Sequence, residues 1–596
     1  MFQSFEVTSR PEQGPPRLAE LRVELMREGL DGFLIPRADA HQGEYVSARD
    51  ERLAWLTGFT GSAGFCAALI NSAGVFIDGR YRTQVKSQVA SDYTPVPWPE
   101  ISLADWLVEQ LPSGGEVGFD PWLHTVAQIE QTRTALTGTG VTLIPCDNLV
   151  DRIWADQPAP ASEAAKAHPM EFAGESHMDK RTRLAADLIK ADQTAAVITL
   201  PDSVCWLLNI RGADIPRNPI AQGFAVLNAD TTVDLFMTPS KLDGLEDHLG
   251  DMVRVHPPSD FLKHLEGLKA KIRLDKSSVP MIVADAIGKG AIWGDEPCAL
   301  PKACKNAAEI AGSFEAHLRD GAAVVELLAW LDAQDAGTLT ETQVVAQLEG
   351  YRRRDNALQD ISFETIAGTG PNGAIMHYRV TEETDSTLDD GHLIVLDSGG
   401  QYLDGTTDIT RTIAIGTPPT EACVAFTRVL MGMIAISRLR WPKGLAGRDI
   451  EMIGRLPLWM AGQDFDHGLG HGVGAYLSVH EGPQRLSRAS NVPLQAGMIL
   501  SNEPGYYREG EFGIRIENLI VVEEAPALTG GDDHRAMLNW RTLTFAPIDR
   551  RLIVTEMLDY ESRTWLNAYH AQTLEYLADR VSENAANWLN AATRPI

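Results

Sequence analysis

Several features of secreted and membrane proteins are missing from these 596 residues. The six cysteines form no C-x-x-C pair, which argues against a disulfide framework or a zinc ribbon. The amino terminus lacks the charged-then-apolar layout of a signal peptide, and no run approaches the ~18 apolar residues that a membrane helix needs. We therefore expect a cytoplasmic protein with reduced thiols that does not bind membranes.

Basic residues are also scarce. Lysine and arginine together number 52 against 81 acidic residues, which gives a formal net charge of −29. Such a surface repels nucleic acid and anionic lipid, so we expect neither as a partner. Solubility accounts for this charge, and attraction of cations, including metals, is the second interpretation.

The first half of the chain repeats a pattern. A single core stops growing near ~250–300 residues, so the length predicts about two to four domains. A segment with leucines at helical spacing precedes the short buried strand Phe33–Ile35. Residues Arg181–Lys190 and Ala195–Leu200 repeat this order, and Trp206–Gly212 echoes Trp55–Gly61. The repeat indicates two related α/β domains of about 150 residues each. Two unrelated α/β domains, which would show the same order, remain the alternative.

The second half changes character. Pro158–Ser162 is the expected linker within the first half, and Asn306–Glu309 has the spacing of a capping box that opens a helix through Trp330. Strand-like runs with glycine-rich turns are expected over residues 363–522. Residues 561–589 have helical spacing, which fits a packed terminal helix or an oligomer contact. The predicted domain boundaries are 1–157, 158–304 and 305–596.

Two carboxylates follow or precede apolar strands in this second half. The buried run Leu393–Leu396 ends on Asp397, and a turn then leads through Asp408 into the strand Ile409–Ile415. A turn of this kind brings the two strands together, so we expect the carboxylates to face one another. Two facing carboxylates repel unless a proton or a cation lies between them.

Three further residues stand in similar positions. His471 lies in a glycine-rich segment that is not a helical H-E-x-x-H motif, and Glu503 ends another apolar strand. The segment Gly513–Asn518 alternates like a strand, so Glu517 is expected to share its inner face with Arg515. Each residue alone has an ordinary interpretation, as a turn former, a loop histidine, a surface residue or a partner of Arg515. Together, four carboxylates and one imidazole call for two divalent cations. Oxygen-rich ligation favours Mn²⁺, with Zn²⁺, Co²⁺ or Fe²⁺ as competitors.

These motifs resemble a known family. LDSGGQYLDGTTDITRT, HGLGHGVG, VHEGP, NEPGYY and GIRIEN are similar to the signatures of the aminopeptidase P (Xaa-Pro aminopeptidase) family in its long three-domain form. The broader group is the pita-bread metallopeptidases, which includes methionine aminopeptidase and prolidase. DAHQGEY, TGFTGSAG, DGRYR, WLLNIRG and TGPNGAIMHY extend the resemblance over nearly the whole chain. It implies an α/β and α+β fold, with two related creatinase-N-like α/β domains followed by a pita-bread catalytic domain.

The resemblance also implies a role for each residue. Asp408 and Glu517 would bridge two metal ions, usually Mn²⁺. Asp397 would complete one ion, and His471 with Glu503 the other. The remaining assignments concern substrate and catalysis. His377 and His480 would bind substrate and stabilise the tetrahedral intermediate, Glu503 would move the proton, and His467 would line the pocket. Arg80 would contact substrate, unless its D-G-R tripeptide is only a surface turn.

The function implied is a dinuclear-metal aminopeptidase. It would hydrolyse the amino-terminal Xaa-Pro bond of peptides through a metal-bridging hydroxide, and the long form of the family suggests a homodimer. A prolidase, which cleaves Xaa-Pro dipeptides, shares the metal site and is the nearest alternative. A non-catalytic peptide- or histone-binding module and a metal-free, creatinase-like hydrolase are further alternatives, and the complete ligand set argues against both.

Overall fold

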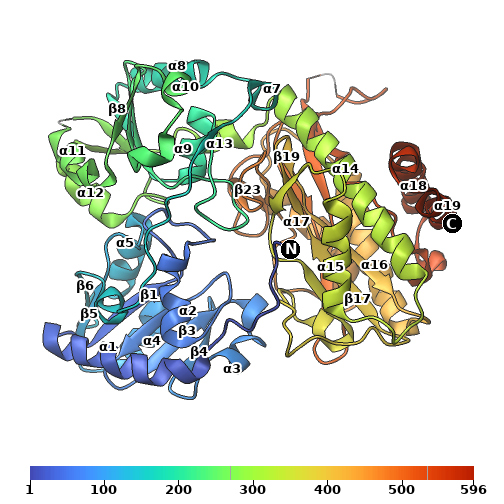
Figure 1. Ribbon diagram of the computed structural model, residues 1–596, viewed down its shortest axis with the longest axis horizontal. Coiled ribbons are helices and arrows are strands. Elements are labelled where there is room, and N and C mark those ends of the chain that lie inside the picture. Colours follow the sequence, from blue (N-terminus) through green and yellow to red (C-terminus); the bar gives the residue numbers. More distant parts are fainter. Residues whose placement is uncertain (269, 533) are drawn as a thin grey trace. The chain divides into compact units, whose positions relative to one another are not determined.

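The computed structural model describes residues 1–268, 270–532 and 534–596. They fall into two compact units, which are described separately (Figure 1). The amino-terminal unit comprises Thr8–Met170 and Glu175–Ala299. The carboxy-terminal unit comprises Leu300–Ile596 together with Met1–Val7 and Glu171–Gly174.

The first half of the amino-terminal unit is a mixed six-stranded sheet with helices. Its strand order is β4-β3-β2-β1-β5-β6. Helix α1 buries Leu18, Leu21 and Leu25 completely and ends at Gly29, whose φ of 72° is the left-handed conformation that glycine tolerates. The elements are α1 (Gly14–Glu28), β1 (Gly32–Pro36), α2 (Arg52–Thr57), β2 (Phe65–Leu69), β3 (Ala73–Ile77), α3 (Val85–Gln88), β4 (Thr94–Pro97), α4 (Leu103–Gln110), β5 (Gly115–Phe119), α5 (Val126–Ala135), β6 (Val141–Pro145) and α6 (Leu149–Ile153).

The second half of this unit repeats the first. Its sheet has the order β12-β11-β10-β8-β13-β14. The corresponding strand pairs have the same directions, antiparallel for the pairs at β2 and β10 and parallel for the others. The elements are β7 (Lys166–Ala167), α8 (His177–Lys190), β8 (Ala195–Ile198), α9 (Pro201–Leu208), β9 (Ile210–Arg211), β10 (Phe224–Asn228), β11 (Val233–Phe236), α10 (Glu246–Leu249), β12 (Val253–His256), α11 (Phe261–Gly267), β13 (Ile272–Leu274), α12 (Met281–Ile287) and β14 (Ala291–Trp293). The short helix α7 (Met170–Ala173), between β7 and α8, belongs mostly to the carboxy-terminal unit.

This identical topology confirms two related domains. The sequence echo also has a physical basis, because α2 and α9 both end on a left-handed residue, Gly58 with φ 86° and Asn209 with φ 49°. The expected linker lies between α6 and β7, where residues 157–165 form no helix or strand.

The long helix α14 lies near the start of the main segment of the carboxy-terminal unit. The predicted capping box is present. Asn306 Oδ1 accepts hydrogen bonds from the backbone N–H groups of Ala308 and Glu309, and the side chain of Glu309 accepts one from the backbone N–H of Asn306. The larger elements are α13 (Ala299–Ala303), α14 (Ala307–Asp332), α15 (Glu341–Arg352), β15 (Leu358–Ile361), β16 (Ile366–Thr369), β17 (Leu393–Ser398), β18 (Gly400–Tyr402), β19 (Gly405–Thr406), β20 (Ile409–Ala414), α16 (Thr420–Ser437), β21 (Arg440–Pro442), α17 (Gly447–Trp459), β22 (Gly470–Gly472), β23 (Glu481–Leu486), β24 (Ile499–Asn502), β25 (Gly505–Arg508), β26 (Phe512–Arg515), β27 (Asn518–Glu524), β28 (Met537–Thr542), α18 (Tyr560–Leu577) and α19 (Glu583–Ala592).

Strand alternation directs polar side chains to one face of the sheet β16-β17-β20. Leu396 of β17 and Ile413 of β20 share a buried core with Leu327 of α14. Since neighbouring residues of a strand point to opposite faces, Asp397 and Thr410 face away from these helices. The same logic holds in the six-stranded sheet β21-β28-β27-β24-β22-β23, whose apolar face packs against α16 and α17.

Three expectations for this region were wrong in detail. Residues 363–522 contain the helices α16 and α17 as well as strands. The terminal helical stretch is divided into α18 and α19. The GIRIEN segment is not one strand, because β26 ends at Arg515 and pairs with β25, whereas β27 begins at Asn518 and pairs with β24 and β28.

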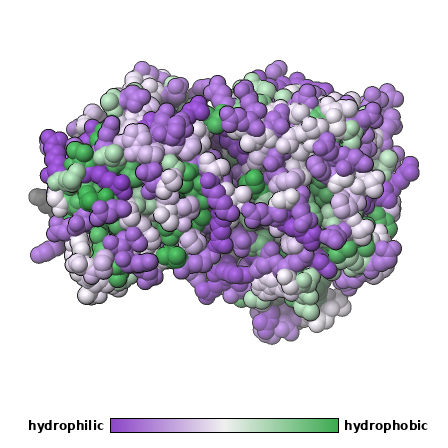
Figure 2. Space-filling model, turned by 90° about the horizontal axis from the view of Figure 1, so that it is seen from below, coloured by the Kyte–Doolittle hydropathy of each residue, from purple (hydrophilic) through white to green (hydrophobic). Residues whose placement is uncertain are grey.

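By length and composition, α16 is the one helix of the described residues that could cross a membrane. Its Phe426, Val429 and Met433 are buried in the core of the carboxy-terminal unit, which is typical of an internal helix. Hydrophilic residues cover most of the face drawn in Figure 2, as the net charge of −29 leads one to expect. All six cysteines are free, as expected.

Candidate metal centre

The five predicted ligands lie at strand ends of the carboxy-terminal unit. Asp397 lies in β17, and Asp408 directly precedes β20, which pairs with β17 so that Asp397 is opposite Thr410. His471 is the middle residue of β22, and Glu503 follows β24. Glu517 occupies the short break between β26 and β27. Residues more than a hundred positions apart therefore converge.

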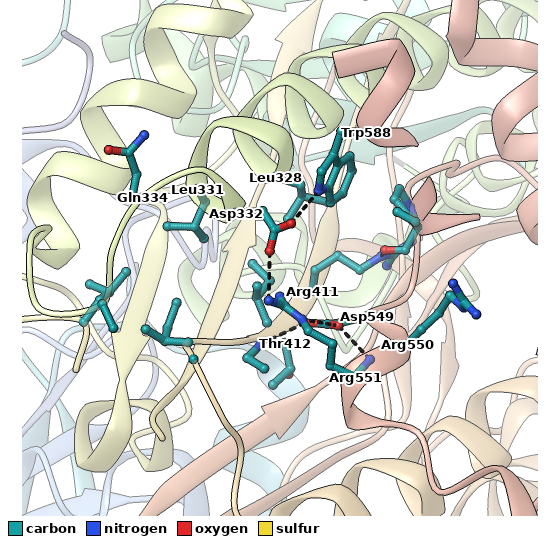
Figure 3. A pocket seen from close by; sticks show the side chains of 18 of the residues that line it. Leu328, Leu331, Asp332, Gln334, Arg411, Thr412, Asp549, Arg550, Arg551 and Trp588 are labelled. Carbon is teal, nitrogen blue, oxygen red and sulfur yellow. Dashed lines mark hydrogen bonds and ion pairs between the residues drawn. The ribbon is translucent and has the colours of Figure 1, made fainter. Parts of the chain in front are cut away.

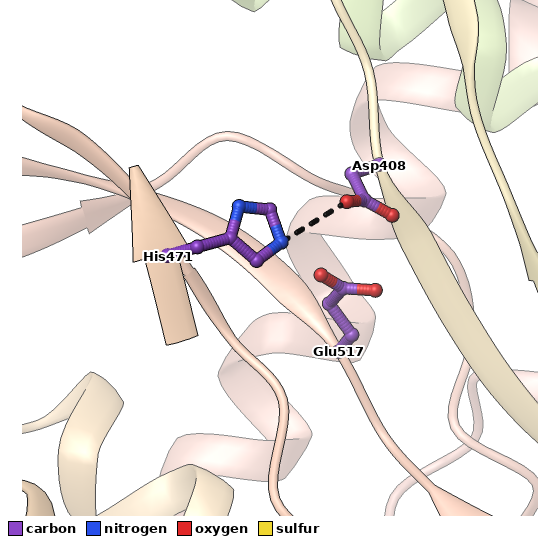
Figure 4. Close-up of side chains that lie close together, drawn as sticks. All are labelled: Asp408, His471 and Glu517. Atoms are coloured by element: carbon purple, nitrogen blue, oxygen red, sulfur yellow. Dashed lines mark ion pairs between the residues drawn. The ribbon is translucent and has the colours of Figure 1, made fainter. Parts of the chain in front are cut away.

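Three of these side chains form a compact donor set. Asp408, His471 and Glu517 each offer one ligand atom, and these atoms lie within 4.8 Å of one another (Figure 4). His471 Nε2 is 3.5 Å from Asp408 Oδ2 and 3.4 Å from Glu503 Oε1, so Glu503 belongs to the same cluster. Asp397 is close enough for its charge to raise the pKa of both Asp408 and Glu517.

The cluster contains polar atoms that the protein itself does not satisfy. Asp397 Oδ1, Asp408 Oδ1 and Glu517 Oε1 are buried without a hydrogen-bond partner. An unpaired buried carboxylate oxygen is costly, and three at one place indicate a missing positive charge. Three orphaned oxygens beside an imidazole nitrogen suit divalent cations that accept mixed oxygen and nitrogen ligands.

The electrostatics of the carboxylates agree with this interpretation. Burial, and then the charges of Asp397 and Glu503, raise the pKa of Asp408 well above its ordinary value. Burial, and then Asp408, raise the pKa of Glu517 in the same way, and burial also raises the pKa of Glu503. A divalent cation among these oxygens would instead favour the ionised carboxylates.

Hydrogen bonds fix the orientation of the predicted ligands. His471 Nδ1 donates to Gly472 O at 2.9 Å, which leaves the lone pair of Nε2 directed toward the carboxylates. Ser501 Oγ accepts from His471 N at 2.9 Å and donates to Glu503 Oε1 at 3.0 Å. Thr410 Oγ1 donates to Glu517 Oε2 at 2.8 Å. These contacts leave the orphaned oxygens as the free ligand positions.

Arg515 connects the cluster to a histidine outside it. Its Nη2 donates to Asp397 Oδ2 at 2.7 Å and its Nη1 to Tyr507 Oη at 2.7 Å. Burial raises the pKa of Tyr507 to about 12, so its hydroxyl keeps its proton at neutral pH. His467 Nδ1 donates to Gly468 O, so its Nε2 can accept the Tyr507 proton at 2.9 Å.

The other two predicted histidines also adjoin the cluster. The His480 ring lies edge-on to the His471 ring, with centroids 4.3 Å apart. The next residue, Glu481, is buried and ion-paired with Lys302 and Lys305. His377 follows Met376, whose carbonyl accepts from Arg515 Nη1 at 3.2 Å. Arg80, in the amino-terminal unit, is paired with Asp78 at 2.7 Å and stays a prediction.

Sequence reasoning did not single out Thr410, Ser501 or Tyr507. Each nevertheless had a signal: Thr410 and Ser501 each lie two residues from a predicted ligand, and Tyr507 belongs to the NEPGYY motif. The alternative pairing of Glu517 with Arg515 was wrong, because Arg515 pairs with Asp397.

A further cavity of the carboxy-terminal unit lies away from this cluster. It measures about 440 Å³ and is lined by β20, α14 and the carboxy-terminal segment (Figure 3). Asp332 accepts from Arg551 at 2.8 Å and from Trp588 at 2.9 Å, and Arg551 also pairs with Asp549. These charges neutralise one another, and the predicted ligands are not among the lining residues, so we assign the chemistry to the carboxylate cluster.

Family comparisons cover almost the entire chain. Residues 311–524 match metallopeptidase family M24, and residues 536–596 match the C-terminal region of that family. Residues 17–153 and 156–309 each match the creatinase/prolidase N-terminal domain, in agreement with the duplicated topology.

Individual relatives agree with these matches. The chain is 38% identical to a probable Xaa-Pro aminopeptidase P of Coccidioides posadasii, over 99% of this chain and 95% of that protein. Its structure is similar to that of an X-prolyl aminopeptidase from Caenorhabditis elegans, described as a cytosolic enzyme with a di-nuclear active site, with 32% identity, a TM-score of 0.93, and coverage of 98% of this chain and 100% of that one. A dipeptidase, PepE, from Mycobacterium ulcerans is 26% identical with a TM-score of 0.51, and covers 62% of this chain and 96% of its own.

Proposed function

Because this chain belongs to the Xaa-Pro aminopeptidase P group of metallopeptidase family M24, we propose that it removes the first residue from peptides whose second residue is proline. The observation that carries the proposal is the convergence of Asp408, His471 and Glu517 on one small volume beside orphaned buried oxygens. Packing alone does not explain why buried carboxylates with unsatisfied oxygens converge, whereas binding of cations does.

The donor set supports two divalent cations. We propose that Asp408 and Glu517 bridge them, that Asp397 completes one, and that His471 and Glu503 complete the other. When bound, such a pair would lower the pKa of a water molecule toward neutrality and polarise the scissile carbonyl. Mn²⁺ is the proposed ion, with Zn²⁺, Co²⁺ and Fe²⁺ as competitors, because oxygen ligands outnumber nitrogen four to one.

The chain's own groups position the peptide and move protons. We assign Glu503 as the proton shuttle, since its side chain is 17% exposed whereas that of Asp408 is 5% exposed, so a substrate can reach it. His377 and His480 would donate to the oxygen that becomes negative, and loss of one such donor typically costs ~10²–10³ in rate. His467 would line the pocket, and Arg80 would contact the peptide.

Proline specificity follows from the chemistry of the scissile bond. An Xaa-Pro bond is a tertiary amide without an N–H, so its site needs no hydrogen-bond acceptor there but must fit a ring. A prolidase is the second candidate, because prolidases share this type of metal site. The full-length relatives favour the aminopeptidase, whereas the dipeptidase similarity leaves more than a third of the chain unmatched.

A peptide panel separates these candidates. Purified protein is assayed on an Xaa-Pro dipeptide, on Xaa-Pro-Yaa and longer peptides, and on matched Xaa-Ala peptides as the control. We expect cleavage of the longer proline peptides and little of the alanine ones. Strong preference for the dipeptide would instead establish a prolidase, and binding of peptides by a metal-free, inert protein would establish a non-catalytic module.

Further proposals concern the setting of the enzyme. The domain boundaries 1–157, 158–304 and 305–596 and the cytoplasmic location remain proposals, the latter supported by the absence of paired cysteines. We also propose a homodimer. Helix α17 supports it, because Met452, Leu456, Trp459 and Met460 form an exposed apolar stripe at helical spacing, with Leu456 52% and Met460 81% exposed.

A further inference from the structure

A buried carboxylate that the proposed mechanism does not use lies at the start of α15. Glu341 is fully buried, yet it is far in sequence from the metal ligands and contacts none of them in the described residues. It accepts hydrogen bonds from Thr369 N at 2.7 Å and from Asn372 Nδ2 at 3.1 Å. It also accepts from Tyr378 Oη at 2.8 Å and from Ser386 N at 3.2 Å. One carboxylate thus accepts hydrogen bonds from four residues of the segment 369–386.

This segment carries His377, which lies between two anchors. On its amino-terminal side, Met376 O accepts from Arg515, which also binds the ligand Asp397. On its carboxy-terminal side, Tyr378 is tied to Glu341. The residues before and after His377 are therefore fixed, one to the metal cluster and the other to Glu341, so the position of the imidazole depends on both anchors.

We propose that Glu341 is a positioning residue that sets His377 against the metal ligands through Tyr378 and Asn372. The proposal deepens the proposed function and rests on it. Glu341 touches neither substrate nor metal; it acts by holding the segment on which a substrate-binding histidine is carried. A displacement of about 1 Å at such a group can cost ~10²-fold in rate.

The protonation of Glu341 supplies a distinctive readout. Burial raises the pKa of Glu341 to about 7, against the hydrogen bonds from Thr369, Asn372, Tyr378 and Ser386, which lower it. The segment also carries the charged residues Arg379, Glu382, Glu383 and Asp385. Arg379 is ion-paired with Glu364, and Asp385, which accepts from Thr342 N and Oγ1, is the one whose charge acts on Tyr378. Ionised Glu341 accepts a charge-assisted hydrogen bond from Tyr378 Oη, which is stronger than the bond that a protonated Glu341 would accept.

The test uses the full-length, metal-loaded enzyme and the variants Glu341→Gln and Glu341→Ala. Glutamine reproduces the protonated carboxyl group, so the ratio of wild-type to Glu341→Gln kcat/KM should be near one at pH 6 and rise about three- to tenfold by pH 8. Titrations at the metal site cancel in this ratio. Glu341→Ala should lower kcat/KM by about 10–100-fold at unchanged metal content. The matched control is Glu349→Ala, another buried carboxylate of α15, which should stay within about twofold.

A double-mutant cycle separates positioning from general damage. If Glu341 acts through His377, the variant Glu341→Ala/His377→Ala should be no worse than His377→Ala alone, within about twofold. Effects that multiply would overturn the proposal, as would a wild-type to Glu341→Gln ratio that does not change with pH.

Hydrogen exchange distinguishes this proposal from the proposed function. Amides of residues 369–386 should exchange faster in Glu341→Ala than in wild type, whether or not the protein cleaves Xaa-Pro peptides. Faster exchange without any peptidase activity would defeat the proposed function alone. Unchanged exchange in that segment, with peptidase activity present in wild type, would defeat the role of Glu341 alone.

Discussion

At the scale of single residues, the four carboxylates proposed as metal ligands could be singled out because each lies at or next to the end of a strand. A carboxylate in that position must be compensated, so Asp397, Asp408, Glu503 and Glu517 are conspicuous in the sequence alone. The partner of Arg515 could not be predicted in the same way. Local alternation suggested Glu517, whereas the actual partner, Asp397, lies 118 residues away on another strand. Long-range pairing of this kind is decided by the fold.

Thr410 offers a test at this scale. Its hydroxyl donates to Glu517 and accepts from Arg515 Nε at 3.3 Å, so Thr410→Val removes one contact of a proposed bridging ligand without changing its volume much. We expect a 10–100-fold loss of metal affinity or activity, the usual cost of losing such an outer hydrogen bond. Titration of activity with Mn²⁺ measures it.

The matched control for this variant is Thr427→Val. Thr427 is a fully buried threonine of α16 whose hydroxyl donates to Cys423 O. Its variant should keep the wild-type Mn²⁺ dependence, and an equal loss in both variants would mean that Thr410 acts only through stability.

At the scale of elements, helices α16 and α17 were the part of the fold that sequence patterns did not predict. Helix α16 is buried on most sides, so its apolar residues lack a clear amphipathic period. Helix α17 contains Gly454 and Pro457, which normally argue against a helix. The glycines have a packing reason: a Cβ on Gly432 of α16 would lie 2.1 Å from Gly454 O, so the two helices meet backbone to backbone.

Helix α18 gives a prediction about pH and stability. His570 is fully buried, and its Nε2 accepts from Ile548 N at 3.1 Å. Burial, and then Arg411 and Arg550, lower the pKa of His570 from 6.5 to about 3. Below pH 6.5 this histidine binds a proton in the unfolded chain but stays neutral in the folded chain. Its contribution to the free energy of unfolding is therefore complete above pH 6.5 and is lost as the pH falls toward 3.

Between pH 7.5 and 5, this single group should reduce the free energy of unfolding of wild type by about 2 kcal/mol. His570→Gln can keep the bond to Ile548 but does not titrate, so the difference in free energy of unfolding between wild type and variant should shrink by that amount as the pH falls. Denaturant unfolding at the two pH values measures it, and a difference that does not change with pH would refute the assignment.

At the scale of the whole molecule, the duplicated amino-terminal domains and the distinct carboxy-terminal region were predictable, because repeated segment order survives in the sequence. The exposed apolar stripe of α17, on which the proposed dimer rests, could not be predicted from the sequence pattern, because such a stripe is recognisable only after folding. Met452, Leu456, Trp459 and Met460 are interrupted in sequence by polar and buried residues, and they become one surface only when α17 forms.

The dimer proposal is tested by Leu456→Asp. A charge in the centre of the stripe should shift wild-type dimer to monomer in sedimentation or light scattering, since an unpaired charge at a buried apolar contact is strongly unfavourable. Val23→Asp, at a 57% exposed position of α1, is the control and should leave assembly unchanged. A Leu456→Asp protein of wild-type mass would exclude the α17 stripe as the interface.

The central claim is that the five-residue cluster holds two catalytic cations, and one measurement addresses it directly: metal content per chain and activity on an Xaa-Pro-Yaa peptide, determined together on wild type and Asp408→Asn after chelation and stepwise return of Mn²⁺. We predict that wild type regains activity as it binds about two ions per chain, whereas Asp408→Asn stays folded, binds fewer and remains nearly inactive. Full wild-type activity in the absence of metal, or an Asp408→Asn protein with two ions and normal turnover, would contradict the account.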